Sequence, residues 1–175
     1  ASGALDLERL LFIPAADPLH KRDEHKSSIE HRLAMLDRAI ADNPHFEISR
    51  IDIDRPGPHY SVDMVRMIGE QFPGAELYFV MGGDSLIDLP KWHRPAEFIQ
   101  QCKLVVMRRP DESIRADMHD AVLPGLSGRV VMIDAPLVGV SSTLIAERVV
   151  QGQSIRYLVP DGVLNYIVRH RLYET

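Results

Sequence analysis

Short apolar runs alternate along the chain with segments whose apolar residues recur at helical spacing. Residues 10–13, 76–81, 103–107 and 129–133 are brief, largely apolar runs, which are typical of strands. Residues 46–54 alternate apolar and polar positions, but the phase slips near Arg50, so we expect a strand with a bulge or bend there. Each of these runs precedes a stretch of helical periodicity.

The predicted helices have recognisable starts and stops. Ser27 precedes Glu30 at capping-box spacing, and the helix that follows should end near Asn43-Pro44. Ser61 is the expected cap of the next helix. Shorter helices are predicted over 85–89, 95–101 and 144–151, a last one from Pro160, and a short helix with a loop within 111–128. The expected buried faces comprise Ile29, Leu33, Leu36 and Ile40; Val65, Ile68 and Phe72; and Val163, Leu164, Ile167 and Val168.

This alternation predicts an α/β fold, a doubly wound and mostly parallel sheet with helices on both faces, as a single domain over residues 1–175. Ligands of such sheets bind outside the carboxyl ends of the strands. Polar loops follow several predicted strands, at 14–26, 82–85, 108–109 and 139–143. We therefore expect a ligand site where these loops converge.

Composition narrows the class of function. The chain is 45% hydrophobic and 26% charged with a net charge of −5, which disfavours a general nucleic-acid binder. Cys102 is the single cysteine, so an intramolecular disulfide and a cysteine-based zinc site are excluded, and a reducing cytoplasm fits. No apolar run approaches the length of a membrane span, and the eight histidines lack metal-site spacing, so we predict no protein-bound metal.

The loop at 139–143 ends in Ser141-Ser142-Thr143 where a helix is predicted to begin. Backbone N–H groups at a helix start lack partners within the helix, and the helix dipole favours an anion there. Hydroxyl side chains add donors, so this stretch is a candidate phosphate cradle. Serine and threonine are also the preferred helix caps, and the stretch alone does not separate the two interpretations.

The other loops carry similar alternatives. Gly82-Gly83-Asp84 after a strand lets a backbone approach a ligand, or forms a tight turn capped by Asp84. His20-Lys21-Arg22 suits a phosphate ester or a solvated loop. Trp92, the only tryptophan, can stack on a planar ring or fill the edge of a core. Arg108 and Arg109 at a strand end suit phosphate or a charged surface.

Several motifs are absent or weak. No G-x-x-x-x-G-K-S/T and no G-x-G-x-x-G after a strand occur, which disfavours P-loop and classical dinucleotide sites. Gly83-Asp84-Ser85-Leu86 matches the nucleophile block of the GDSL esterases. In those enzymes the block is N-terminal and a D-x-x-H lies near the C-terminus. Here the block is central and no such C-terminal motif follows, so an esterase with Ser85 as nucleophile is the weakest alternative.

Taken in order, these segments resemble the bacterial nicotinate-mononucleotide adenylyltransferases of the HxGH-type nucleotidyltransferase superfamily. The resemblance covers nearly the whole chain and is more specific than any one motif. The blocks that carry it are residues 11–15, 18–21, 31–36, 52–63 and 78–86, Trp92, residues 108–110, 140–145 and 155–160. It implies a Rossmann-like nucleotidyltransferase fold, ATP and nicotinate mononucleotide as substrates, and Mg2+ bound with ATP.

The resemblance also implies roles for individual residues. The catalytic group would comprise His20, Lys21, Ser142 and Thr143, near the reacting phosphates. The ATP site would comprise Gly82, Asp84, Arg108, Ser141, Ser142 and Thr143, and the pyridine pocket His59, Tyr60 and Trp92. The reaction would form nicotinate adenine dinucleotide and pyrophosphate without a protein nucleophile, in a cytoplasmic enzyme that needs no nucleic acid or membrane and is compatible with a homo-oligomer.

Two departures from the family pattern stand out. The family's opening strand and its G-G-x-F-D-P-x-H-x-G-H loop are missing from this chain, and we expect them in residues upstream of Ala1. The family's arginine after S-S-T-x-I is Ala146 here, with Arg148 two residues on; Lys21, Arg108 or Arg156 are the candidate substitutes. The alternative is a non-catalytic nucleotide-binding relative that has lost these histidines and this arginine.

Overall fold

The computed structural model describes residues 5–16, 27–109, 113–136 and 138–174. His20 and Lys21 therefore lie outside the described residues. The elements, in chain order, are β1 (Leu10–Phe12), α2 (Ile29–Ile40), β2 (Phe46–Ile48), α3 (Ser61–Gln71), β3 (Tyr78–Gly82), α4 (Gly83–Asp88), η1 (Leu89–Lys91), α5 (Pro95–Gln101), β4 (Lys103–Arg108), η2 (Ser127–Arg129), β5 (Val130–Asp134), α6 (Ser142–Val150) and α7 (Asp161–His170).

The chain divides into two compact units. Apart from a few residues at its start, one unit comprises residues 55–137 and the other residues 6–54 and 138–175. Each unit is described by itself. Parallel strands alternate with helices in both, which confirms the predicted α/β class, whereas the single domain over 1–175 stays a prediction.

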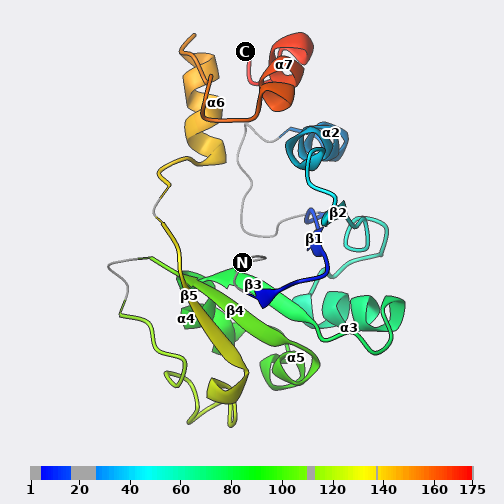
Figure 1. Cartoon of the computed structure of the whole chain (residues 1–175), viewed down its shortest axis with the longest axis vertical. Helices are drawn as coiled ribbons and strands as arrows, with labels where there is room; N and C mark the ends of the chain where they lie inside the picture. The colour runs from blue at the N-terminus through cyan, green and yellow to red at the C-terminus, as the bar shows by residue number, and fades with distance from the viewer. Residues whose placement is uncertain (1–4, 17–26, 110–112, 137, 175) are drawn as a thin grey trace. The chain divides into compact units, whose positions relative to one another are not determined.

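The unit of residues 55–137 is built on the parallel sheet β3-β4-β5 (Figure 1). Helices α3, α4 and α5 surround its core, with α3 packed on α5. Leu104 and Val106 of β4 are fully buried, as are Leu86 of α4, Leu89 of η1 and Phe98 of α5. Among the three strands of this sheet, the central strand β4 is the most buried, because protein covers both of its faces.

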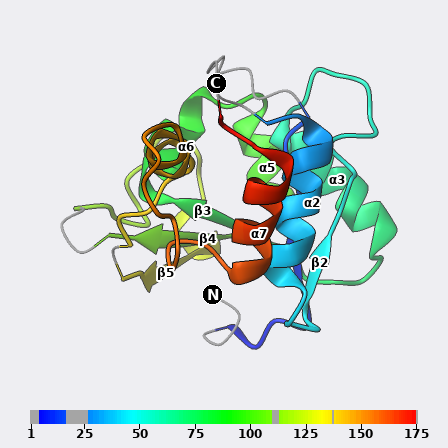
Figure 2. The same ribbon diagram turned by 90° about the horizontal axis from the view of Figure 1, so that it is seen from above.

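The described residues of the second unit form the parallel pair β1-β2 and the helices α2, α6 and α7. Helix α2 lies beside α7, as Figures 1 and 2 both show. The core cluster joins Ile145 of α6 to Val163 and Ile167 of α7 and to Ile155 in the loop between them. The described strands therefore form two sheets, of two and three strands, where the sequence predicted a single sheet.

The predicted strand at 46–54 is wrong beyond Ile48. The chain turns at Arg50, whose carbonyl accepts hydrogen bonds from the N–H groups of Ile53 (2.8 Å) and Asp54 (2.9 Å). The Arg50 guanidinium closes the same turn with an ion pair to Asp54 at 2.9 Å. The slip in the apolar pattern marks this turn rather than a bulge.

Three details of the predicted helices are also wrong. Ser28, not Ser27, caps α2, and its Oγ accepts from the His31 N–H (3.4 Å). Tyr60 occupies the cap position of α3, and Ser61 is the first helical residue. Val168, which was predicted to lie on the buried face of α7, is 63% exposed, and the buried residues of that helix are Val163 and Ile167.

The long connection after β4 is mostly turns in its described part, followed by η2. The Asp120 carboxylate accepts from the N–H (2.9 Å) and the hydroxyl (2.6 Å) of Ser127, so the loop is closed by its own side chains. Among the described residues, no helix is long and apolar enough to cross a membrane.

Candidate functional site

Gly82 and Arg108 lie at the carboxyl ends of adjacent strands. Gly82 ends β3 opposite Met107, and Arg108 ends β4 one residue further on. No described atom lies within 4 Å of where a Cβ on Gly82 would stand, so the backbone there faces open space. Ligands of parallel sheets bind at this edge. Two of the residues expected from the sequence to bind ATP, Gly82 and Arg108, therefore lie where such a site would be formed.

Asp84 is exposed in the first turn of α4, directly after Gly82. The cap position of this helix is occupied by Gly82, so the alternative in which Asp84 caps the helix is wrong. Its carboxylate is therefore placed to accept hydrogen bonds from donors outside the helix.

The Arg108 side chain is held by a carboxylate on the neighbouring strand. Arg108 pairs in register with Asp134 of β5, and its Nε and Nη2 both donate to Asp134 Oδ1, at 2.8 and 2.6 Å. The ion pair is partly exposed, so its own contribution to stability is small. Its effect is to keep a guanidinium at the carboxyl edge of the sheet.

Tyr60 and Trp92 contact the same apolar cluster from different segments. The Trp92 indole meets Phe79 of β3 edge-on, at a ring-centroid distance of 5.9 Å, and Phe98 of α5 at 5.4 Å. Tyr60 packs on this cluster from the residue before α3, and His59 beside it is half-buried. The structure thus brings two of the three predicted pyridine-pocket residues to one core and places His59 next to them.

Sequence reasoning missed the contacts around these aromatic residues. The His93 imidazole stacks on Tyr60 at 3.9 Å with 18° between the rings. Arg94 pairs with Asp63 of α3 at 2.6 Å. The only signal in the sequence was that His93 and Arg94 follow Trp92.

The start of α6 lies in the second unit. Ser141 caps the helix, and its Oγ accepts from the Leu144 N–H (3.1 Å). Ser142 and Thr143 are exposed in the first turn. The capping interpretation is thus observed for Ser141, while Ser142 and Thr143 are exposed at the helix start.

The position of the missing family arginine is packed inside this unit. Ala146 is only 4% exposed. The Nε and Nη2 atoms of Arg148, two residues on, donate to the Ser154 carbonyl at 2.9 and 2.8 Å. Arg156 lies with its guanidinium 5.8 Å from the ring of exposed Tyr157.

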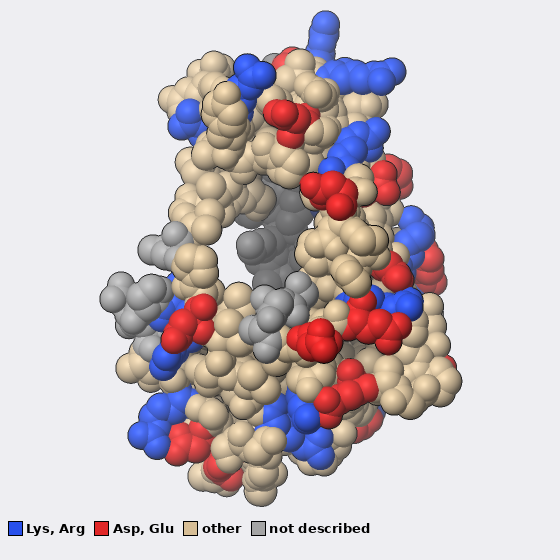
Figure 3. All heavy atoms as spheres, in the orientation of Figure 1, with Lys and Arg blue, Asp and Glu red and all other residues tan. Residues whose placement is uncertain are grey.

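Several groups in the unit of residues 55–137 have shifted pKa values. At the start of β3 and β4, the hydrogen bond from Lys103 lowers the pKa of Glu76, and Tyr78 donates to the same carboxylate. Burial raises the pKa of the Cys102 thiol to about 12. Within the described part of the chain, no group of three or more His, Cys, Asp or Glu residues could hold a metal ion. Basic and acidic side chains both occur across the face shown in Figure 3.

Known proteins are similar to this chain in sequence. The cytidylyltransferase-like family model matches residues 1–148. A protein of Thermomicrobium roseum named "Probable nicotinate-nucleotide adenylyltransferase" is 43% identical over 98% of this chain and 80% of its own length. One of Roseiflexus sp. is 42% identical over 98% of this chain and 85% of its own length.

A solved structure shares the fold. Nicotinic acid mononucleotide adenylyltransferase of Plasmodium falciparum, complexed with NaAD, superposes with a TM-score of 0.70 at 14% identity, over 95% of this chain and 83% of that one. The chain belongs to the cytidylyltransferase-like nucleotidyltransferases and, among them, to the nicotinate-nucleotide adenylyltransferases. The resemblance found in the sequence is confirmed.

Proposed function

We propose that this protein transfers the adenylyl group of ATP to nicotinate mononucleotide, giving nicotinate adenine dinucleotide and pyrophosphate. The observation that carries the proposal is 43% identity to an enzyme of that name over 98% of the chain. Identity sustained over this length supports an enzyme rather than a non-catalytic nucleotide-binding relative.

The chemistry needs orientation and charge stabilisation more than a nucleophilic side chain. The phosphate of nicotinate mononucleotide attacks the α-phosphorus of ATP, the bond to the β-phosphate breaks, and pyrophosphate leaves. Holding both substrates in line and stabilising the charge on the transferred group accounts for the catalysis. His20 and Lys21 remain proposed near the reacting phosphates.

The described residues suit the ATP side of this reaction. The open backbone at Gly82 admits close approach of a ligand, and exposed Asp84 accepts hydrogen bonds. Arg108 supplies a planar cation for phosphate oxygens. Ser142 and Thr143 add hydroxyl donors at the α6 N-terminus, where the dipole favours an anion. Mg2+ would enter bound to the ATP phosphates, whose oxygens are its preferred ligands.

The described aromatic residues suit the pyridine side. Tyr60 and Trp92 are partly buried and pack on one apolar cluster. Their aromatic side chains offer the pyridine ring of the substrate a stacking surface and apolar surroundings. His59 lies next to Tyr60 in sequence and completes the proposed pocket. The buried and unpaired state of Cys102 supports a cytoplasmic location.

The test measures pyrophosphate release from ATP and nicotinate mononucleotide. We expect Trp92→Ala to raise the KM for nicotinate mononucleotide about tenfold, since ring stacking is lost, while Trp92→Phe keeps most of the affinity. We expect Ser142→Ala to raise the KM for ATP about tenfold. Arg66→Gln, which removes an exposed ion pair with Glu70, is the control and should behave as wild type. Unchanged kinetics in both site variants would refute the site assignment.

A further inference from the structure

Three consecutive residues, Trp92 to Arg94, tie the loop between η1 and α5 to three other elements. Trp92 contacts Phe79 of β3 and Phe98 of α5. The next residue, His93, stacks on Tyr60 with a ring-centroid distance of 3.9 Å. The side chains of these three residues contact different parts of the unit. The position of Trp92 therefore depends on the contacts that hold the next two residues, His93 and Arg94.

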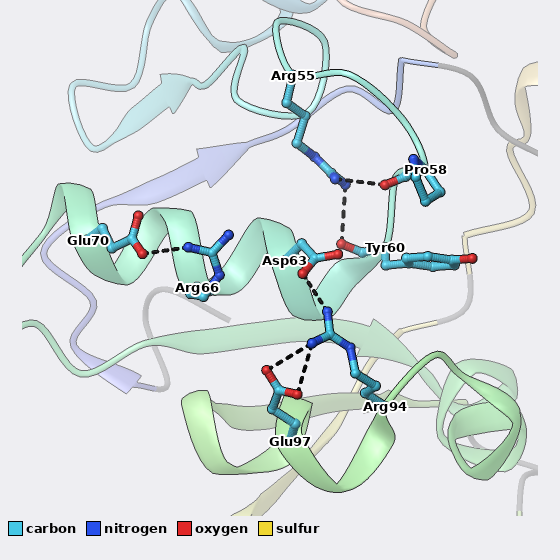
Figure 4. A network of polar contacts seen from close by, with 8 residues as sticks. All are labelled: Arg55, Pro58, Tyr60, Asp63, Arg66, Glu70, Arg94 and Glu97. Carbon is cyan, nitrogen blue, oxygen red and sulfur yellow. Dashed lines mark hydrogen bonds and ion pairs between the residues drawn. The ribbon is translucent and has the colours of Figure 1, made fainter.

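Arg94 supplies the polar tie. Its Nη2 donates to Asp63 Oδ1 in the first turn of α3 at 2.6 Å, and its Nη1 donates to Glu97 Oε2 of α5 at 3.1 Å (Figure 4). The Asp63 side chain is 27% exposed and that of Arg94 44% exposed, so the pair lies at the edge of the core. One guanidinium therefore joins the starts of two helices.

The backbone of Arg94 is in the left-handed region, with φ at 50°. This conformation is unfavourable for a residue other than glycine and persists where the surroundings determine it. The ion pairs to Asp63 and Glu97 and the fixed start of α5 at Pro95 are such surroundings. The turn that follows Trp92 and directs His93 toward Tyr60 is thus held from both sides.

The Tyr60 side of the arrangement is fixed as well. Arg55 Nη1 donates to the Pro58 carbonyl at 3.0 Å, and its Nη2 donates to the Tyr60 carbonyl at 3.2 Å (Figure 4). These bonds hold the backbone on both sides of His59. Both segments of the proposed pyridine pocket therefore have an arginine that positions them, and Arg94 joins one segment to the other through Asp63.

We propose that Arg94 is a positioning residue for the pyridine nucleotide: through Asp63 it holds the Trp92–His93 segment against Tyr60 and sets the spacing of the two aromatic walls. This inference rests on the proposed function, in which Tyr60 and Trp92 line the pyridine pocket. Because the tie acts on these walls, its loss should weaken binding of nicotinate mononucleotide and leave ATP binding unchanged.

The kinetic test compares Arg94→Gln with Arg66→Gln, which removes an exposed ion pair of α3 that has no contact with this loop (Figure 4). Arg94→Gln should raise the KM for nicotinate mononucleotide about three- to fivefold, with KM for ATP and kcat within about twofold. Asp63→Asn should match it, the double variant should be no worse than either, and Arg94→Lys should restore most of the loss. Glu97→Gln leaves the Asp63 tie in place and keeps a side-chain oxygen that can accept from Arg94, so it should have little effect.

A second measurement needs no turnover. Trp92 is the only tryptophan among the chain's aromatic residues, so tryptophan emission, excited at the long-wavelength edge where the five tyrosines do not absorb, reports on this loop alone. Arg94→Gln should shift the emission to longer wavelength and raise acrylamide quenching about twofold, because the indole loses part of its packing, whereas Arg66→Gln should match wild type.

Two results would overturn the inference: emission and KM of Arg94→Gln equal to wild type, or equal increases of both KM values together with a lower unfolding temperature. If the wild-type protein forms no dinucleotide, the proposed function fails, while the fluorescence comparison still shows whether Arg94 positions Trp92.

Discussion

Cys102 shows how burial alone sets the chemistry of a residue. Its side chain is 4% exposed in the core between α5 and β4, and its Sγ donates weakly to the Phe98 carbonyl at 3.7 Å. Loss of solvation disfavours the thiolate and raises the pKa to about 12 from an ordinary value of 9.0. The thiolate is the reactive form, so Cys102 should be inert in the folded protein.

We predict that a disulfide reagent at pH 8 does not modify Cys102 in the native protein. Modification should become as fast as that of a free thiol only when denaturant unfolds the chain. The measurement is the rate of thiol release with and without denaturant. Rapid modification under native conditions would contradict the burial of this side chain.

The same thiol predicts a loss of stability at high pH. The unfolded chain releases the proton near pH 9 and the folded chain only near pH 12, so the native state binds more protons in this window. The free energy of unfolding should therefore fall above pH 9, by on the order of 1 kcal/mol per pH unit from this group. Cys102→Ala should remove that part of the decline in chemical denaturation at pH 8 to 11. Parallel pH profiles of the two proteins would contradict it.

At the residue scale, the sequence was enough to single out candidate site residues but not the side-chain contacts that they make. The glycine, the aspartate and the single tryptophan could be singled out because each follows a predicted strand or stands alone in a loop. The His93–Tyr60 stack and the Arg94–Asp63 pair could not, since they join residues about thirty positions apart. Their side chains meet only once α3 and α5 are packed together.

At the scale of elements, strands and helices followed from apolar periodicity where the chain is continuous. The failure at residues 51–54 has a local cause: Arg50 and Asp54, four residues apart, close a turn by an ion pair and two backbone hydrogen bonds. The apolar periodicity of a sequence does not reveal such local bonds. The alternate apolar positions of Ile51 and Ile53 therefore led to the wrong prediction of a strand. The start of α6 is a different case, because a serine there can either cap the helix or bind a phosphate, and the sequence pattern is the same for both.

The α6 start can be resolved by two neighbouring substitutions. Ser141→Ala should lower the free energy of unfolding by about 1 kcal/mol, because the Leu144 N–H loses its cap. Ser142→Ala should change stability by less than about 0.5 kcal/mol, since its side chain is exposed, and should weaken ATP binding. Chemical denaturation and ATP titration of both variants give the answer. Equal loss of stability in the two would contradict this division of roles.

At the scale of the whole molecule, the ligand site at the carboxyl ends of the strands stays a prediction, whereas the alternation of strands and helices was enough to predict the α/β class. It could not predict that the described strands form two sheets, because strand order depends on tertiary pairing rather than on periodicity. It also could not show that Ala146 is buried. The position where the family has an arginine is therefore packed in the core of this unit. Family membership rests on similarity along nearly the whole chain.

The most direct test of the account is the identity of the product formed from ATP and nicotinate mononucleotide. We predict that mass spectrometry detects nicotinate adenine dinucleotide in amounts equal to the pyrophosphate released, and that both decrease together in Trp92→Ala. ATP that remains bound while no dinucleotide forms at any substrate concentration would contradict the account.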